Sequence, residues 1–171
     1  MSGPRVVLIG PQGAGKTTVA ELLAERWGVG ARDTDRDVEA TEGRSVSDIF
    51  VDDGEAVFRD LERVAAAEAL ASWDGVLALG GGAVLDEHTR AALAGHCVVF
   101  LQVGLSDAVK RVGLGVGRPL VFGNVRAQLK AMLDERLPIY QQASTATVQT
   151  DGRTPEEVAD EVAAIVEADR G

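Results

Sequence analysis

Eight consecutive residues near the start of the chain have the spacing of a phosphate-binding loop. Segment 10–17 reads Gly-Pro-Gln-Gly-Ala-Gly-Lys-Thr and matches G-x-x-x-x-G-K-[ST] at every fixed position. Glycines let the backbone curl so that several N–H groups point at one phosphate. The N-terminus of the helix that follows adds partial positive charge. Lys16 would then reach the β- and γ-phosphates, and the Thr17 hydroxyl would bind Mg²⁺. The segment therefore predicts a P-loop that binds a nucleoside triphosphate.

The residues around this loop narrow the reaction that it could serve. Signalling GTPases normally carry an N-K-x-D guanine motif, which this sequence lacks. Large ATPases need a longer chain and an apolar strand that ends in a magnesium-binding aspartate. Here the apolar run 76–79 is followed by Gly80, Gly81 and Gly82. The 171 residues have the size of one domain, which favours a kinase of small molecules.

Two aspartates follow the second predicted strand, in the order Asp33-Thr34-Asp35. The carboxyl ends of parallel strands lie at one edge of a sheet, where ligands bind, so we expect this pair beside the P-loop. One carboxylate could help to hold magnesium through water. The other could accept a hydrogen bond, or the proton itself, from a substrate hydroxyl. A solvated acidic turn is the alternative, because Asp37 and Glu39 are close in the sequence.

Glycines and arginines provide further candidates for the acceptor side. Gly80–Gly82 would expose backbone N–H groups and let a ligand approach without interference from Cβ atoms, although a tight turn would use the same residues. Arg59 lies early in a predicted helix, and Arg136 lies in the segment Glu-Arg-Leu-Pro-Ile-Tyr. Each is either an ordinary surface arginine or a two-pronged ligand for a carboxylate.

The charge of the chain limits its partners. The net charge of −10 argues against a nucleic-acid surface, which needs a basic patch. An acidic protein must hold an anion with locally placed cations, and the chain contains 14 Arg and 3 Lys. The sequence contains no run of 18 apolar residues, so we expect no membrane span. The single cysteine, Cys97, excludes an internal disulfide and favours a cytoplasmic protein.

Short apolar runs alternate with helical patterns along the whole chain. We predict strands over 5–9, 29–33, 76–79, 97–103 and 146–149, and helices over 15–26, 55–72, 87–93, 106–112, 125–133 and from 154 onward. The last helix begins with a capping box formed by Thr154 and Glu157, with Pro155 at its first position. The alternation predicts parallel strands with right-handed crossovers in a three-layer α/β domain. The Gly-rich segment 113–123 is either an ordinary loop or a closing lid.

Taken together, these segments resemble the shikimate kinases along nearly the whole chain. The matching segments are GPQGAGKTT at 10–18, DTD at 33–35, DGEAVFRDLE at 53–62, LGGGAV at 79–84, GRPL at 117–120 and ERLPIY at 135–140. Many kinases share the P-loop, but the order D-T-D, F-R-x-x-E and G-G-G-A-V is much more specific. Segment 112–125 departs from the family apart from Arg118 and Pro119.

The resemblance implies a role for each matching residue. ATP phosphates would bind to Gly13, Ala14, Gly15, Lys16, Thr17 and Thr18. Mg²⁺, as one ion with ATP, would be held by Thr17 and, through water, by Asp33. Arg118 would reach the ATP phosphates from a lid at about 112–125, and Arg111 and Arg153 would flank the adenine. Lys16, Asp35 and Arg118 would be the catalytic residues.

The acceptor of the phosphate would be shikimate. Asp35 would contact its hydroxyls, including the reacting 3-hydroxyl, within a region at about 33–62. Arg59 and Arg136 would clamp its carboxylate, and Gly80, Gly81 and Gly82 would line the pocket. These contacts use charge-assisted hydrogen bonds, which are the strong ones in proteins.

The resemblance also implies the fold and the biological setting. We expect a three-layer α/β/α P-loop kinase with five parallel strands in the order 2-3-1-4-5 and a mobile lid. Residues 1–171 would form a single kinase domain, working as a cytoplasmic monomer in chorismate and aromatic amino-acid biosynthesis. Two alternatives stay open from the residues alone: another small kinase, such as a gluconate kinase, and a P-loop module that binds nucleotide without turnover.

Overall fold

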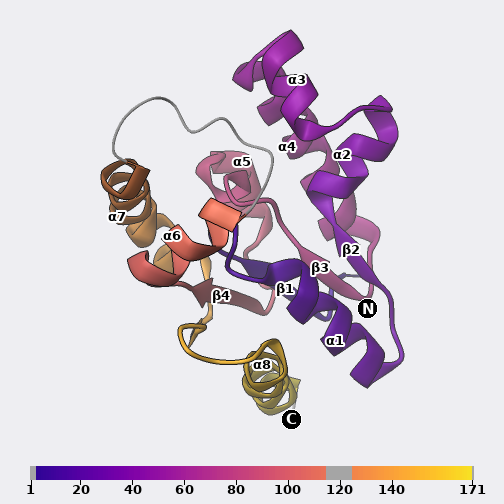
Figure 1. Ribbon diagram of the computed structural model, residues 1–171. Coiled ribbons are helices and arrows are strands. Elements are labelled where there is room, and N and C mark those ends of the chain that lie inside the picture. The colour runs from indigo at the N-terminus through magenta and orange to yellow at the C-terminus, as the bar shows by residue number, and fades with distance from the viewer. Residues whose placement is uncertain (1–2, 115–124, 171) are drawn as a thin grey trace.

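Five parallel strands form the centre of the computed structural model, which describes residues 3–114 and 125–170 (Figure 1). They are β1 (Val6–Ile9), β2 (Ala31–Asp33), β3 (Val76–Ala78), β4 (Val98–Gln102) and β5 (Ala146–Gln149). Their order in the sheet is β2-β3-β1-β4-β5, as predicted. Each predicted strand is present, and four of the five are shorter than predicted by one or two residues at one or both ends.

The central strand β1 shows why the sheet is buried on both faces. Val6 and Leu8 belong to one core cluster, whereas Val7 and Ile9 belong to another, and all four are at most 1% exposed. Successive side chains of a strand point to opposite faces. A continuous apolar run therefore requires a cover of helices on each side.

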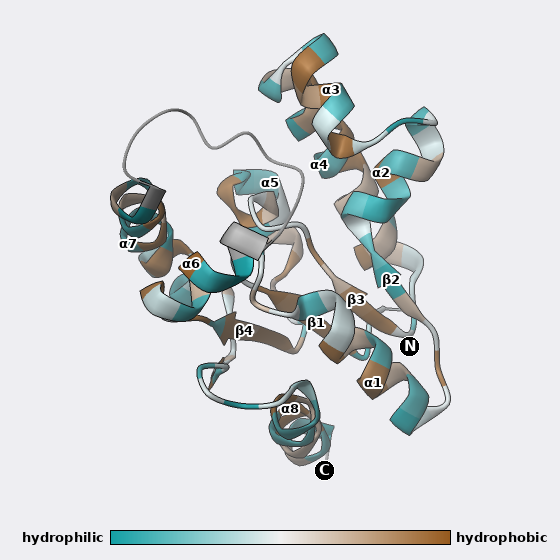
Figure 2. Cartoon of the chain, viewed as in Figure 1, coloured by the Kyte–Doolittle hydropathy of each residue, from teal (hydrophilic) through white to brown (hydrophobic). Residues whose placement is uncertain are grey.

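Helices provide these two covers (Figure 1). On one face, α1 (Lys16–Trp27) and α8 (Pro155–Arg170) pack against the cluster that contains Val6 and Leu8. On the other face lie α4 (Glu55–Ser72), the short η1 (Ala83–Leu85), α5 (Glu87–Ala92) and the C-terminal part of α7 (Val125–Ala143). Helix α6 (Leu105–Leu114) follows β4. Figure 2 shows brown, apolar residues on the strands and teal, polar residues mainly on the outer sides of the helices.

Helices α2 (Thr34–Glu42) and α3 (Val46–Asp53) were not predicted from the sequence. They project beyond the sheet and form a small lobe with α4 (Figure 1). In α2 only Thr34 and Val38 are buried, so its apolar stripe is too short to give a helical period. Both helices depend on caps instead. The Asp33 side chain accepts from the amides of Asp35 and Arg36, and the Ser45 hydroxyl accepts from the amide of Asp48.

Helix α7 continues ten residues beyond the predicted end at 133 and passes through Pro138. A proline inside a helix removes one backbone hydrogen bond. Burial of Tyr140, with Leu137, Ile139 and Ala143 packed against the same core, offsets this loss. The capping box of α8 is confirmed: the Thr154 amide donates to Glu157 Oε1, and the Glu157 amide donates to Thr154 Oγ1, both at 3.1 Å.

Part of the predicted lid, residues 115–124 with Arg118, lies outside the described residues. Within the described part of the chain, no helix combines the length and the apolar character needed to cross a membrane.

We predict that Leu101→Ala lowers the free energy of unfolding by about 2–5 kcal/mol, because it leaves a cavity at a fully buried position of β4. Urea denaturation followed by circular dichroism measures the loss. Val51→Ala, at a valine of α3 that is 75% exposed, is the control and should change the stability little. Equal effects of the two substitutions would contradict the two-faced core described above.

Candidate active site

The P-loop connects β1 to α1, and one of its side chains binds its own backbone. Gly15 precedes the helix with φ 91°, a left-handed conformation that glycine adopts without strain. The Lys16 side chain folds back across the loop, where its Nζ donates to the carbonyl oxygens of Gly10 at 2.7 Å and Pro11 at 2.9 Å. The ammonium group is therefore held over the loop, beside the N-terminus of α1.

A cavity of about 270 Å³ opens on the α8 side of this loop. It is lined by Gly13, Ala14, Gly15, Thr18, Val19, Arg111, Thr150, Arg153, Pro155 and Val158. Arg111 Nη1 donates to the Gly13 carbonyl at 2.8 Å, and Arg153 Nη1 donates to the Gln149 carbonyl at 2.9 Å and Glu161 Oε1 at 2.7 Å. The structure thus brings the two arginines predicted for adenine to one cavity with four of the six loop residues predicted for the phosphates.

The two residues predicted to hold magnesium are in contact. The Thr17 hydroxyl donates to Asp33 Oδ2 at 2.6 Å, while Asp33 Oδ1 accepts from the Asp35 amide at 2.9 Å. Among the described residues, no group of three or more His, Cys, Asp or Glu side chains could enclose a metal ion. One hydroxyl and one carboxylate are instead the sparse oxygen set by which Mg²⁺ is commonly held when a nucleotide supplies further ligands.

The Gly80–Gly82 turn lies directly beside the P-loop. A methyl group on Gly81 would lie 3.0 Å from the amide nitrogen of Gln12. On the α2 side, the Gly80 amide donates to Thr34 Oγ1 at 3.0 Å, and both groups are buried. A methyl group on Gly80 would lie 2.5 Å from Asp35 Oδ1 and 2.8 Å from Glu62 Oε2. The turn therefore separates the P-loop from two carboxylates.

Both arginines predicted for the acceptor carboxylate reach this turn. Arg59 lies against Gly82 so closely that a methyl group there would overlap its guanidinium. Arg59 Nη1 donates to Glu62 Oε1 at 2.8 Å, and Nη2 donates to Glu55 Oε2 at 3.2 Å. Burial opposes the charge of Arg59, but the two glutamates outweigh it and raise its pKa above the ordinary value. On the other side, Arg136 Nη1 lies 3.5 Å from the Gly81 carbonyl oxygen.

Three residues of this site received no role in the sequence analysis: Thr34, Glu62 and Tyr140. Glu62 is only 3% exposed, which is unusual for a carboxylate and is explained by its pairing with Arg59. Its position three residues after Arg59 in a helix was a readable signal. Thr34 and Tyr140 contact Gly80 and Gly81 from 46 and 59 residues away, respectively, so no local pattern could reveal them.

Chemically, the arrangement is a pair of candidate anion sites that lie side by side at the carboxyl ends of the strands. Loop N–H groups, Lys16 and the α1 terminus suit phosphates. Across Gly81, Arg59 and Arg136 offer charge-assisted donors for a carboxylate, and Asp35 offers an acceptor for a hydroxyl. This geometry suits transfer between a nucleotide and a hydroxylated acid.

Comparisons with known proteins agree with the geometry. The family model described as "Shikimate kinase" matches residues 12–167. A shikimate kinase of Salinispora arenicola is 64% identical over 165 residues, which cover 96% of this chain and 99% of that protein. One of Thermobifida fusca is 62% identical over 162 residues, covering 95% and 94%. The solved structure of shikimate kinase from Acinetobacter baumannii in complex with shikimate aligns with a TM-score of 0.88 at 30% identity, covering 99% of this chain and 95% of that chain.

We predict that Gly82→Ala displaces Arg59 without unfolding the protein. The φ of Gly82 is −104°, which alanine also adopts, and the obstructed atoms belong to the tip of a flexible side chain. The melting temperature should therefore change little. The affinity for shikimate, the acceptor anticipated from the sequence, should fall about tenfold or more, since a charge-assisted hydrogen bond contributes about 1.5–3 kcal/mol. Isothermal titration calorimetry measures the loss.

The matched control is Glu55→Ala, which removes the weaker partner of Arg59 but leaves the turn clear. It should affect shikimate affinity much less than Gly82→Ala. If Gly82→Ala bound shikimate normally, the closeness of Arg59 to this turn would have no consequence for the site.

Proposed function

This chain belongs to the shikimate kinase family, a family of ATP-dependent kinases, and we propose that it transfers the γ-phosphate of ATP to the 3-hydroxyl of shikimate. The products would be shikimate 3-phosphate and ADP, on the route to chorismate and the aromatic amino acids. One observation carries the proposal. The P-loop lies against Gly81 of the Gly80–Gly82 turn, and two arginines and two carboxylates also lie against this turn.

In this proposal the nucleotide half works by orientation and charge neutralisation, which are what phosphoryl transfer mainly requires. The amides of residues 13–18 cradle the phosphates. Lys16 exchanges its bonds to the loop carbonyls for the β- and γ-phosphates, which it can do because its Nζ already spans the loop. Arg111 and Arg153 flank the base in the cavity beside Gly13. Arg118, outside the described residues, adds positive charge at the phosphates.

The proposed cofactor is one Mg²⁺ ion bound with ATP. The Thr17 hydroxyl would supply one direct oxygen ligand, and Asp33 would act through a water molecule. Asp33 is oriented for this role because one of its oxygens caps α2 while the other faces Thr17. When bound, the ion neutralises the charge that develops on the transferred phosphate.

In the acceptor half, Asp35 would accept a hydrogen bond from the 3-hydroxyl of shikimate and receive its proton as the new bond to phosphorus forms. Arg59 and Arg136 would hold the carboxylate at the far end of the ring. Glu62 is a positioning residue for Arg59, because its buried carboxylate binds Nη1 at 2.8 Å. The substrate carboxylate would replace the exposed Glu55 at Nη2. Two anchored ends keep the hydroxyl in line with the γ-phosphorus.

The two alternatives left open by the residues are less well supported. A gluconate kinase would also bind a hydroxy acid, but the family of this chain is that of the shikimate kinases. A regulatory module without turnover would not need the acceptor groups around Gly81. We further propose a single kinase domain that acts as a monomer in the cytoplasm, where ATP and magnesium are both available.

The proposed reaction predicts magnesium-dependent release of ADP when ATP and shikimate are both present, and little release with gluconate or nucleoside monophosphates. A coupled ADP assay over this panel, with EDTA as the metal-free control, measures it. Tight binding of ATP without turnover of shikimate would overturn the proposal.

Lys16→Ala should remove most of the rate, by about a hundredfold or more, because it removes a charge that stabilises the transferring phosphate. Lys130→Ala is the matched control, since this lysine of α7 has an exposed side chain paired with Asp134. Its kcat should stay normal. A near-normal kcat in Lys16→Ala, with the fold verified by circular dichroism, would contradict the P-loop assignment.

Arg136→Ala should raise the KM for shikimate about tenfold to a hundredfold while leaving the KM for ATP nearly unchanged, because the lost donor binds only the carboxylate. Arg26→Ala, which breaks an exposed ion pair between α1 and α8, serves as the control. A change confined to the KM for ATP would show that Arg136 belongs to the other half of the site.

A further inference from the structure

Tyr140 is a buried polar side chain that the proposed reaction does not use. It lies on α7, one turn after Arg136, and is 2% exposed. Its hydroxyl donates to the carbonyl oxygen of Gly81 at 2.5 Å. Burial raises the pKa of Tyr140, so the hydroxyl stays protonated, and remains a donor, throughout the neutral range.

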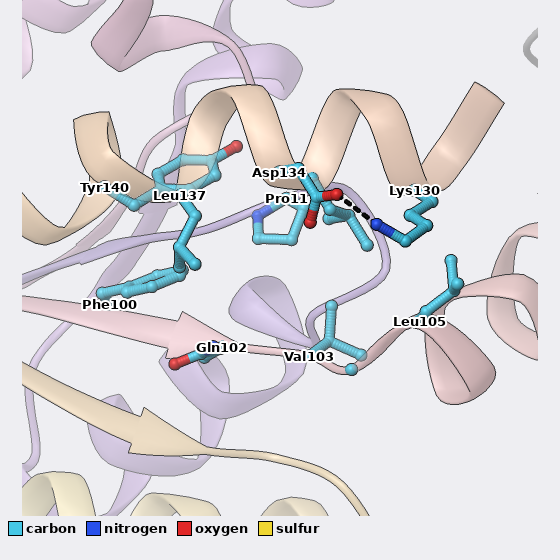
Figure 3. Close-up of a pocket in the computed structure, with 11 residues that line it drawn as sticks. Pro11, Phe100, Gln102, Val103, Leu105, Lys130, Asp134, Leu137 and Tyr140 are labelled. Carbon is cyan, nitrogen blue, oxygen red and sulfur yellow. Dashed lines mark hydrogen bonds and ion pairs between the residues drawn. The ribbon is translucent and has the colours of Figure 1, made fainter. Parts of the chain in front are cut away.

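The ring of Tyr140 packs on an aromatic residue of the sheet. It stacks on the Phe100 ring of β4, with centroids 4.9 Å apart and planes inclined by 21°. Figure 3 shows the two rings one above the other, at one end of a cavity of about 170 Å³ that Pro11 of the P-loop also lines. The stacking buries the ring against the sheet, and the hydrogen bond to Gly81 gives the hydroxyl its direction.

Two donors from one helix share the same acceptor. Arg136 Nη1 lies 3.5 Å from the Gly81 oxygen, a full ångström farther than the Tyr140 hydroxyl. A buried carbonyl that loses its partner costs about 1–3 kcal/mol. Because Tyr140 already satisfies this carbonyl, the guanidinium of Arg136 can leave it for a substrate carboxylate without that cost.

The same hydrogen bond sets the orientation of the next amide. In a trans peptide group the carbonyl and the N–H point in opposite directions, and the described residues contain no cis peptide bond. With the Gly81 carbonyl drawn toward α7, the Gly82 N–H must point away from α7. Arg59 contacts the same residue, Gly82. The Tyr140 hydroxyl therefore holds the orientation of the peptide group between Gly81 and Gly82.

We propose that Tyr140 is a positioning residue for acceptor binding: by occupying the Gly81 carbonyl, it keeps Arg136 available for the substrate carboxylate and fixes the Gly80–Gly82 turn. This inference rests on the proposed function, since it takes Arg136 as a ligand of the acceptor. It is specific to the acceptor half, because the Tyr140 hydroxyl binds the carbonyl beside Arg136, and Tyr140 does not line the cavity of Arg111 and Arg153.

The first test is Tyr140→Phe, which removes one oxygen atom and keeps the ring. Without the hydroxyl, Arg136 Nη1 is the donor that remains at the buried carbonyl among the described residues, and shikimate must displace it. The KM for shikimate should therefore rise about tenfold, with the KM for ATP and kcat nearly unchanged. In an Arg136→Ala background, adding Tyr140→Phe should raise it much less, since the two effects run through one contact.

Phe100→Leu is the matched control. It removes the stacking partner but keeps the hydroxyl, so it should lower the melting temperature while shikimate affinity changes little. If Tyr140→Phe lowered only the melting temperature and left the KM for shikimate normal, Tyr140 would be a packing residue and the proposal would be wrong. That result is distinguishable from failure of the proposed function, in which the unmodified protein would not phosphorylate shikimate at all.

A second readout does not require a substitution that could disturb folding. Tyr140 is the only tyrosine of the chain, so growth on 3-fluorotyrosine labels this one site for fluorine NMR. The single resonance should shift when shikimate is added to the labelled enzyme and should respond much less to ATP. A resonance unaffected by saturating shikimate would overturn the proposal.

Discussion

The arrangement of the site depends on the close approach of the Gly80–Gly82 turn to its neighbours on both sides. One glycine touches the P-loop at Gln12, and the flanking two touch Asp35 and Arg59. A side chain at any of these points would have to displace a neighbouring group, so the polypeptide backbone itself lies between the P-loop and the acceptor groups. The turn thus keeps the two halves of the proposed site close together, and the ion pair of Arg59 with Glu62 and the Tyr140 hydrogen bond hold the groups around it.

The positive charges of the site are held in place by specific hydrogen bonds. The chain has a net charge of −10, yet both expected ligands are anions. Cations that could bind these anions donate hydrogen bonds to defined acceptors within the protein. Lys16 donates to loop carbonyls, Arg111 to the Gly13 carbonyl and Arg59 to Glu62. Such partners hold the cations in position before any ligand binds, which lowers the entropy lost on binding.

Much of the architecture was readable from local pattern. The strands, their parallel pairing and the capping box at Thr154 were predicted correctly, because they depend on short runs of residues and on the alternation of strand and helix patterns. The strand order was predicted from the family resemblance. The lobe of α2 and α3 was missed for the opposite reason. Its helices bury few residues of their own, and they exist because Asp33 and Ser45 cap them and because Phe58 of α4 completes their small core. The continuation of α7 through Pro138 likewise depends on the packing of Tyr140 against the sheet.

The sequence by itself determined the chemical groups of the site, since the P-loop, Asp33-Thr34-Asp35 and the triple glycine are contiguous motifs at strand ends, and a parallel sheet brings such ends to one edge. The tertiary structure alone decided how those groups are oriented. The Gly80 amide meets Thr34, and the Gly81 carbonyl meets Tyr140, across 46 and 59 residues. A hydrogen bond needs both partners at a given distance and direction, and only the packed arrangement of α2, β3 and α7 sets these.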